Sequence, residues 1–444
     1  MIYNKILNIF VRKTGGIFAG HTNNLPELYH LKSFDCMRIN EVISPLDKKE
    51  FLDFPRRLYK DDSNWVCLLD SELESIFDPE KNYLFQRGSE ASRWILTDEN
   101  GKTSGRIAAF FDRTKSVVYR QPTGGIGFFE VVEKQEAAFT LFDTAKNWLS
   151  SHGMQAMDGP VNFGENDNNW GLLVEGFMQQ GYGMPYHKKY YRDFFEAYGF
   201  RNYYEQYSYH RKVRDEKGAI VEFPPRIMKI AEWLSKRPGY SFRHLEFSKR
   251  NEFVRDLVDI YNSAWSIFKE DFTPLDPESL EAIFQKAKAV IDEELIWFAY
   301  LNEKPIAFFI LFPDLNQIIK PFKGKLNMLN MIRFAWFRAN HKMTRMRAIV
   351  GGVNPSHQNS GVESAIFYQL YQVFKRKPWY KELELSWVGD FNPKMIAIYE
   401  ALGASKAKMH ITYRYMINDK LKFIRYKDEM AQKPGTENAS PAVK

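Results

Sequence analysis

The sequence predicts an α/β protein whose chain runs twice through the same order of strands and helices. Each half reads as a hairpin, a strand, a helix, a strand, a helix and a final strand. A local repeat accompanies this order, because the helix end at 194–200 parallels the one at 398–404 and a tyrosine-rich strand follows each. With 444 residues, the chain is long enough for two domains that each bury a core.

Turn residues and apolar patterns divide the first half into its elements. The run at 98–101 is typical of a tight turn between two strands. Apolar residues three and four apart predict a long helix further on. The predicted elements are strands at 92–96, 105–112 and 125–132, a helix at 134–151, the segment 157–163 in the place of the next strand, a short helix ending at 200 and a strand at 203–210.

A polar linker at 214–218 precedes the second copy. The elements predicted there are helices at 252–267 and 277–290, strands at 295–301, 306–312 and 347–353, a helix at 361–375, a strand at 382–387, a helix at 392–402 and a strand at 409–416. We therefore expect an N-terminal extension at 1–36, domains at 37–215 and 216–427, and a disordered tail at 428–444. The apolar core of the extension is too short for a secretory signal.

Composition limits the classes of protein. Hydrophobic residues make up 44% and charged residues 26%, as in ordinary globular proteins. The 16% of aromatic residues indicates thick aromatic cores or a groove for a long apolar molecule. Cys36 and Cys67 are the only cysteines, so we expect no disulfide framework, no zinc site and a cytoplasmic location. No window reaches the ~20 continuous apolar residues that cross a bilayer.

A basic segment at 318–347 contains no acidic residue. Its basic residues are Lys320, Lys323, Lys325, Arg333, Arg338, Lys342, Arg345 and Arg347. Interleaved aromatic and aliphatic residues are typical of a helix that contacts an anionic membrane or the phosphates of a bulky ligand, and we expect peripheral contact with the inner face of the cell membrane. A solvated face over an ordinary core helix explains the same pattern. No nucleic acid partner is expected, because no recognised nucleic-acid-binding motif accompanies the basic residues.

The strand predicted at 347–353 leads through a loop to a helix that opens at Gly361. A helix N-terminus presents free N–H groups and the positive end of the helix dipole. Such a turn can hold a pyrophosphate, and Gly361 permits close approach of the backbone. An ordinary strand-to-helix turn is the alternative, but Asn392 and Tyr399 further along the chain favour a cofactor site.

These segments resemble the signatures of GNAT-fold acyl-CoA N-acyltransferases. In that family a proline and then Gln-x-x-Gly open a helix, as Pro355, Gln358 and Gly361 do here, and an asparagine precedes a tyrosine in the last helix, as Asn392 precedes Tyr399. The resemblance implies two tandem GNAT-like domains, each a mixed, mostly antiparallel twisted sheet flanked by helices. The residues that it implies for acyl-CoA binding are Val353, Gln358, Asn359, Ser360, Gly361 and Val362.

Two departures from the family pattern concern charge. Glu363 stands where the family has glycine or alanine, and a carboxylate there repels a pyrophosphate unless it points away. In the first half the corresponding loop at 131–136 has no glycine and includes Glu133 and Glu136. We therefore expect the first copy to be structural or substrate-binding and the second to hold the cofactor.

Over its whole length the chain resembles a family of bacterial GNAT-like proteins. The shared segments are Phe54-Pro55, Leu58-Tyr59, 106–109, 159–163 and 313–317. Relatives of that family include the bacterial ceramide synthase, which transfers a fatty acyl group from acyl-CoA to the amine of a sphingoid base. The resemblance implies the same chemistry here, with a sphingoid base or a similar lipid amine as the acceptor.

The resemblance implies direct attack of the amine on the thioester. Backbone N–H groups near Val353 would polarise the thioester carbonyl, and Tyr399 would protonate the departing thiolate. Asn392 would orient the pantetheine or a water molecule. No metal takes part in this expected mechanism.

Asp314 is the predicted general base, because it follows an apolar strand end, and His357 is the second candidate. Capping of a turn together with Asn316 is the alternative role of Asp314. The predicted substrate-binding residues are Asn316, His357, Asn162 and Trp170. Turn capping explains the polar residues around Asn162 equally well.

Two other functions fit the same residues. Some tandem GNAT-like transferases take their acyl group from an aminoacyl-tRNA or a carrier protein, and the basic segment at 318–347 suits either donor. A protein that binds lipid or acyl-CoA without turnover is compatible with Glu363 and with the altered first copy.

Overall fold

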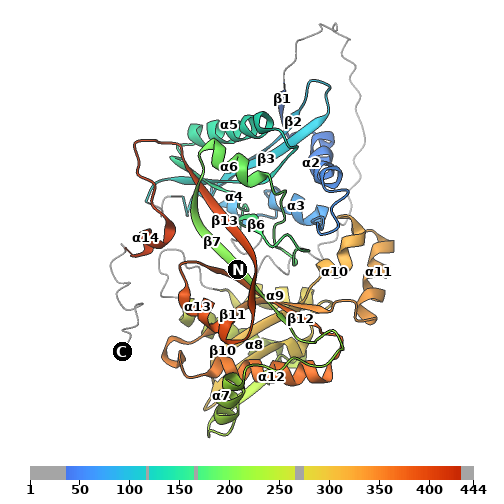
Figure 1. Cartoon of the computed structure of the whole chain (residues 1–444), viewed down its shortest axis with the longest axis vertical. Helices are drawn as coiled ribbons and strands as arrows, with labels where there is room; N and C mark the ends of the chain where they lie inside the picture. Colours follow the sequence, from blue (N-terminus) through green and yellow to red (C-terminus); the bar gives the residue numbers. More distant parts are fainter. Residues whose placement is uncertain (1–36, 117–119, 165–168, 266–274, 432–444) are drawn as a thin grey trace.

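The computed structural model describes residues 37–116, 120–164, 169–265 and 275–431 (Figure 1). The first half contains β1 (Arg38–Glu41), α2 (Pro45–Leu58), α3 (Asp70–Ile76), α4 (Tyr83–Gln86), β2 (Glu90–Thr97), β3 (Thr103–Phe111), β4 (Thr123–Val131), α5 (Gln135–Ser151), β5 (Ala156–Gly159), β6 (Leu172–Glu175), α6 (Tyr191–Tyr198) and β7 (Arg201–Lys212). The predicted strands and helices of this half are confirmed; β1, β6 and the helices α2 to α4 were not predicted.

The second half repeats this strand order without a counterpart of β6, with an insertion between its third and fourth strands and with an added helix at each end. It contains α7 (Pro225–Ser235), β8 (Tyr240–His244), α8 (Arg250–Trp265), α9 (Pro277–Ala287), β9 (Ile296–Leu301), β10 (Lys304–Pro313), α10 (Asn316–Ile319), α11 (Met328–Ala339), β11 (Arg345–Val353), α12 (Val362–Arg376), β12 (Glu382–Gly389), α13 (Pro393–Ala401), β13 (Ser405–Met416) and α14 (Tyr426–Ala431). The insertion is the pair α10 and α11, between β10 and β11. Within the described residues no helix is long and apolar enough to cross a membrane, and no group of three or more His, Cys, Asp or Glu residues could hold a metal ion.

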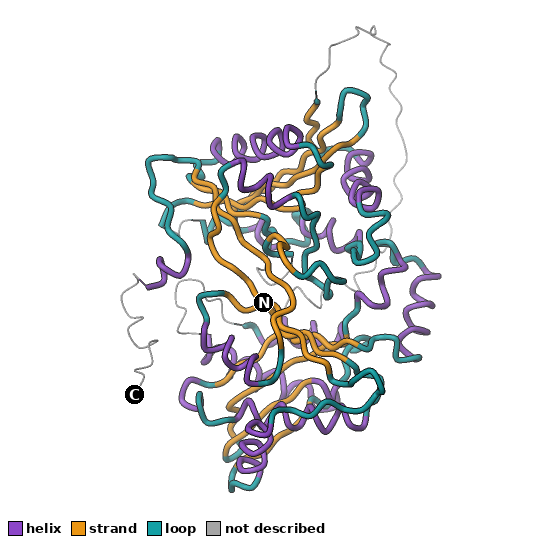
Figure 2. The backbone as a smooth tube through the Cα atoms, in the orientation of Figure 1, coloured by secondary structure: helices purple, strands orange, loops and turns teal. Residues whose placement is uncertain are grey.

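The strands form one mixed sheet with helices on both faces (Figure 2). Its order is β1-β2-β3-β4-β5-β13-β7-β12-β11-β10-β9-β8, and β6 pairs with β13 beside this path. Alternate residues of β9 enter different cores, because successive side chains of a strand point to opposite faces. Ile296 and Phe298 pack with α8 and α9, whereas Trp297 and Ala299 pack with α7 and α12. Burial of both faces explains why this strand is a continuous apolar run.

The last strand of each half pairs with the sheet of the other half. β7 closes the first half in sequence but pairs with β12, and β13 ends the second half but lies between β5 and β7. Met409, Ile411 and Tyr413 of β13 therefore belong to the core of the first half, and Tyr209 of β7 belongs to that of the second. Figure 1 shows the two strands running together from one half into the other. Each half of the sheet therefore includes the last strand of the other half of the chain.

A buried ion pair fastens β13 to the first half. The Arg414 side chain is 1% exposed and donates to both carboxylate oxygens of Asp158 in β5, at 2.6 and 2.8 Å. Burial alone would lower the pKa of Arg414, but the Asp158 carboxylate outweighs it and raises that pKa. The two parallel hydrogen bonds fix both distance and orientation, so they also fix the register of β13 against β5.

Replacing Arg414 with methionine should lower the free energy of unfolding by about 3–5 kcal/mol, because the variant leaves the Asp158 carboxylate without its buried partner. Arg192→Met is the matched control. Both side chains of the Arg192–Glu196 pair are 46% exposed, and we expect a loss below about 1 kcal/mol. Denaturant unfolding measures both values. Equal stability of the two variants would contradict this role for Arg414.

Candidate functional site

Two parallel strands of the second half separate soon after they meet. β11 and β12 pair only from Arg345–Glu382 to Arg347–Glu384. β11 then continues beside β10 with an irregular register at Ile349, a feature that bends a strand. Among the described residues, the edge of β11 that faces β12 has no strand partner beyond Arg347. Its backbone N–H and C=O groups can pair with an extended ligand, as an added strand would.

The first half has the same divergence, but its own chain closes it. β4 and β5 pair over three positions, which end at Gly125 and Asp158. The Val161 N–H then donates to the carbonyl oxygen of Ile126 at 2.7 Å. A Cβ atom on Gly127 would lie 1.9 Å from the carbonyl oxygen of Val161. Backbone after β5 thus lies against β4, so an extended ligand has less access here than in the second half.

Gly361 starts α12 in a left-handed conformation, with a φ of 84°. A Cβ atom at this position would lie 2.5 Å from Cγ2 of Ile230 in α7, so the turn requires glycine on steric as well as conformational grounds. No side chain caps the helix at Gly361. The first N–H groups of α12 therefore lack a capping side chain at the N-cap and can bind an anion, as predicted from the sequence pattern.

The other residues predicted to bind acyl-CoA lie together on this turn. Gln358 and Asn359 are exposed, and Val362 is buried in the core of the second half. The hydroxyl of Ser360 is buried and has no hydrogen-bond partner in the described part of the chain, so it can donate to a ligand. Val353 is half-buried at the end of β11. Their role in binding stays a prediction.

Glu363 is an acidic side chain at the start of α12. Burial raises the pKa of its carboxyl, although a hydrogen bond from its own backbone N–H opposes that shift. The carboxyl group thus lies at one of the N–H groups that a pyrophosphate would use. A bound pyrophosphate must displace it or leave that N–H unused, so Glu363 should weaken anion binding at this turn.

Tyr399 lies in α13 and is 2% exposed. Its hydroxyl oxygen is 3.3 Å from the Oγ atom of Ser386, which follows the point where β12 leaves β11. Burial raises the pKa of Tyr399 to about 12, while the Ser386 hydrogen bond opposes the shift. The hydroxyl is therefore protonated at neutral pH, as a proton donor must be. Asn392 is exposed and caps α13 by accepting the Met395 N–H at 3.2 Å. The catalytic roles of both residues stay predictions.

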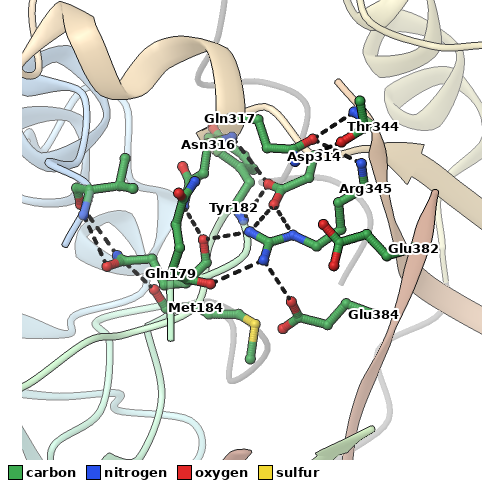
Figure 3. A network of polar contacts seen from close by, with 12 residues as sticks. Gln179, Tyr182, Met184, Asp314, Asn316, Gln317, Thr344, Arg345, Glu382 and Glu384 are labelled. Carbon is green, nitrogen blue, oxygen red and sulfur yellow. Dashed lines mark hydrogen bonds and ion pairs between the residues drawn. The ribbon is translucent and has the colours of Figure 1, made fainter. Parts of the chain in front are cut away.

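Asp314 lies in a buried polar network between the halves (Figure 3). One carboxylate oxygen accepts the N–H groups of Tyr182 and Asn316 at 2.9 and 3.1 Å. The other accepts Nε of Arg345 at 2.7 Å. The bond from Asn316 confirms the turn-capping alternative. With both oxygens bonded and 1% of its surface exposed, Asp314 is poorly placed to take a proton from a substrate.

The same network holds the strands where β11 and β12 part. Arg345 donates to the carbonyl oxygens of Gln179 and Gln180 in the first half, both at 3.1 Å, and lies 3.6 Å from a carboxylate oxygen of Glu384. Lys408 of β13 donates to Glu384 at 2.7 Å. Burial alone would raise the pKa of Glu384, but Lys408 and Arg345 outweigh it and lower that pKa to about 2. The point where β11 and β12 diverge is therefore charged and ion-paired.

Asn316 and His357, both predicted to contact the substrate, lie in different surroundings. Asn316 is 4% exposed and donates from Nδ2 to the carbonyl oxygen of Gln180 at 3.1 Å, so it joins the network around Asp314. The Nδ1 atom of His357 lies 2.8 Å from the hydroxyl of Ser356 in the exposed turn after β11. The structure thus brings Asn316 to Asp314 and His357 to the α12 turn.

Asn162 and Trp170, predicted to bind substrate, lie in the first half. Asn162 is 8% exposed and directly follows Val161, whose backbone lies against β4 where β4 and β5 diverge. Trp170 packs against the cluster of Val161 and Phe163, and its indole donates to the hydroxyl of Tyr204. Neither residue belongs to the α12 turn, and their contact with a substrate stays a prediction.

Glu72 is a buried carboxyl group that was not predicted. It is 8% exposed in α3 and accepts a hydrogen bond from the hydroxyl of Tyr182. Burial raises the pKa of Glu72 to about 7, against the opposing effect of that bond. Tyr182 also lines an apolar pocket behind α11, together with Leu315 and Phe334. An acidic residue in the first turn of a helix is ordinary, so the sequence carried no signal for Glu72.

Two copies of one strand order, each with a parallel pair that diverges after three positions, define the fold as a tandem GNAT fold. No family model matches the chain. The structure aligns with a tandem GNAT protein from the clavulanic acid biosynthesis pathway at a TM-score of 0.51 and 11% identity, over 86% of this chain and 98% of that one. It also aligns with a GCN5-related glucosamine N-acetyltransferase region of a fungal multi-domain β-N-acetylglucosaminidase at a TM-score of 0.51 and 12% identity, over 86% and 38% of the two chains.

Sequence relatives extend over nearly the same part of the chain. This chain is 28% identical to the bacterial ceramide synthase of Caulobacter vibrioides over 381 residues, which cover 84% of this chain and 95% of that protein. It is 25% identical to Protein YghO of Escherichia coli strain K12 over 387 residues, or 85% and 95% of the two proteins. The alignments thus show that the chain has a tandem GNAT fold, as the motifs at Gly361 and Tyr399 predicted.

Glu72 should make the stability of the protein depend on pH. Its pKa of about 7 in the folded state exceeds the ordinary value of 4.5, so the stability that it contributes is complete below pH 4.5 and is lost as the pH rises through about 7. Glu72→Gln removes this titration. In thermal unfolding, the melting temperature of the variant relative to that of the wild type should rise between about pH 5 and about pH 8. A difference that stays constant over this range would contradict the raised pKa.

Proposed function

We propose that the protein is an acyl-CoA-dependent N-acyltransferase and that acyl-CoA binds in the second half, where β11 and β12 diverge. The observation that carries this proposal is the combination of an unpaired strand edge beyond Arg347 with the uncapped start of α12 at Gly361. The strand edge suits the two amide groups of pantetheine, and the helix start suits a pyrophosphate. The Ser360 hydroxyl, which is buried without a partner among the described residues, supplies a further donor.

In the proposed mechanism, backbone N–H groups near Val353 hold the thioester carbonyl and stabilise negative charge as it develops on the oxygen. The acceptor amine attacks the carbonyl carbon, and the bond to sulfur breaks as the amide forms. Tyr399 donates its proton to the departing thiolate, and its pKa of about 12 keeps that proton in place until the charge appears. Asn392, at the start of the same helix, would orient the pantetheine.

The proton released by the attacking amine needs a base other than Asp314, because both oxygens of that carboxylate are bonded. His357, the second candidate from the sequence, is our proposed base. It lies in the turn between β11 and α12, where acyl-CoA is proposed to bind, and its Nδ1 atom is 2.8 Å from the hydroxyl of Ser356.

The proposed acceptor is a lipid amine such as a sphingoid base. The name of the Caulobacter relative supports this choice. A lipid acceptor would be met at a membrane surface, and 318–347 is the segment that we expect to make this contact. The proposed location is therefore the cytoplasm, at the inner face of the cell membrane.

An aminoacyl-tRNA or acyl carrier protein remains the alternative donor, because the segment at 318–347 is basic. Competition against palmitoyl-CoA separates these donors. Binding of acyl-CoA without turnover of any amine would instead favour a non-catalytic lipid-binding protein.

Purified protein incubated with palmitoyl-CoA and sphinganine should release free thiol and form the amide in equal amounts, as followed by mass spectrometry. Tyr399→Phe should lower kcat by about 10²–10⁴-fold, the usual contribution of a general acid. Tyr371→Phe is the matched control, since this tyrosine is also buried in the second core but lies in α12. A folded Tyr399→Phe variant with full activity would exclude Tyr399 as the acid, and absence of any turnover would exclude the sphingoid acceptor.

A further inference from the structure

One face of α11 presents a stripe of exposed apolar side chains. Met328, Leu329, Ile332 and Trp336 are 73, 64, 63 and 56% exposed, respectively. Their spacing places them together on one side of the helix, while Phe334 on the other side packs into the core. These four make up half of the eight large hydrophobic side chains that are exposed in the described residues. An apolar stripe of this kind usually marks a binding surface.

Exposed cations belong to the same segment as the stripe. They are Lys323, Lys325, Arg333, Arg338 and Lys342, and none of them forms an ion pair with a described carboxylate. The remaining basic residues of the segment are already engaged. Arg345 and Arg347 are buried in the part of β11 that pairs with β12, and Lys320 donates to the carbonyl oxygen of Ser63. The sequence pattern therefore overstated the surface charge by these three residues, yet the segment has no acidic residue to offset the other five.

The helix is mounted firmly on the body of the protein. Asn327 caps α11 by accepting the Asn330 N–H at 2.9 Å, and the Asn330 side chain donates back to the carbonyl oxygen of Lys325 at 2.8 Å. Nε of Arg56 in the first half donates to the carbonyl oxygen of Lys323 at 3.1 Å. The stripe is thus a pre-formed face on a helix that both halves support. Figure 1 shows α11 at the edge of the molecule, beside α10.

We propose that this face of α11 docks the protein on an anionic lipid bilayer. The four apolar side chains would enter the boundary between headgroups and acyl chains, and the five cations would contact lipid phosphates. An interface with a second copy is disfavoured, because a two-fold contact would bring both sets of cations together without an acidic residue between them. The inference rests on the proposed function, since it places the proposed lipid acceptor next to the enzyme, but docking itself requires no turnover.

The test is sedimentation of the full chain with vesicles, without acyl-CoA. Vesicles of equal parts phosphatidylglycerol and phosphatidylcholine should bind the protein, and vesicles of phosphatidylcholine alone should bind it at least about tenfold more weakly. The double variant Ile332→Ser, Trp336→Ser should reduce binding to the anionic vesicles by about tenfold or more, because it removes two of the inserted side chains. Trp233→Ser is the matched control, since this tryptophan is 51% exposed on α7 and lies outside the basic segment; it should leave binding unchanged.

Equal binding of wild type and double variant, or equal binding to neutral vesicles, would overturn the proposal. Light scattering supplies the second arm: a dimer that the double variant dissociates, with unchanged vesicle binding, would assign the face to a second copy instead. Amide formation in detergent micelles should be the same for both proteins. A failure of catalysis would therefore leave the vesicle result intact, and a failure of docking would leave the transferase assay intact.

Discussion

The exchange of last strands between the two halves is the constraint on which the rest of the structure depends. Because β7 pairs with β12, the strand that leaves β11 is held on its other side and can diverge without loosening the sheet. Because β13 returns beside β7, it carries Lys408 to Glu384 at the point of divergence. Both halves therefore hold the strands where β11 and β12 diverge, and the first half adds backbone oxygens at Gln179 and Gln180.

The two copies share one scaffold and differ in what occupies the space between the parallel strands. In the first copy the Val161 backbone lies against β4, and the helix that follows begins without a glycine. In the second copy the strand edge is open, and Gly361 starts the helix without a capping side chain. This difference is the physical reason to place the acyl donor in the second half. Glu363 opposes that placement, since it brings a carboxyl group to the helix start where a pyrophosphate would bind.

Local patterns predicted the hairpins, the helices α5, α8, α9 and α12 and the turn at Gly361, because alternation, helical spacing and turn chemistry are properties of neighbouring residues. The partners of β7 and β13 could not be predicted, since a tyrosine-rich alternating strand reads the same whichever sheet it joins. Burial decided the roles of charged residues. Asp314 follows a strand end, as a base could, but Arg345 and two N–H groups bind its oxygens. Burial raises the pKa of Glu72.

The most direct test of the site in the second half compares two glutamates at the second position of their helices, Glu363 in α12 and Glu136 in α5. Calorimetric titration with CoA should show tighter binding to Glu363→Ala than to the wild type, by about three- to tenfold, because the variant frees an N–H group and removes a negative charge from the helix start. Glu136→Ala should bind CoA like the wild type. Tighter binding by Glu136→Ala together with no change in Glu363→Ala would place CoA in the first half and contradict this account.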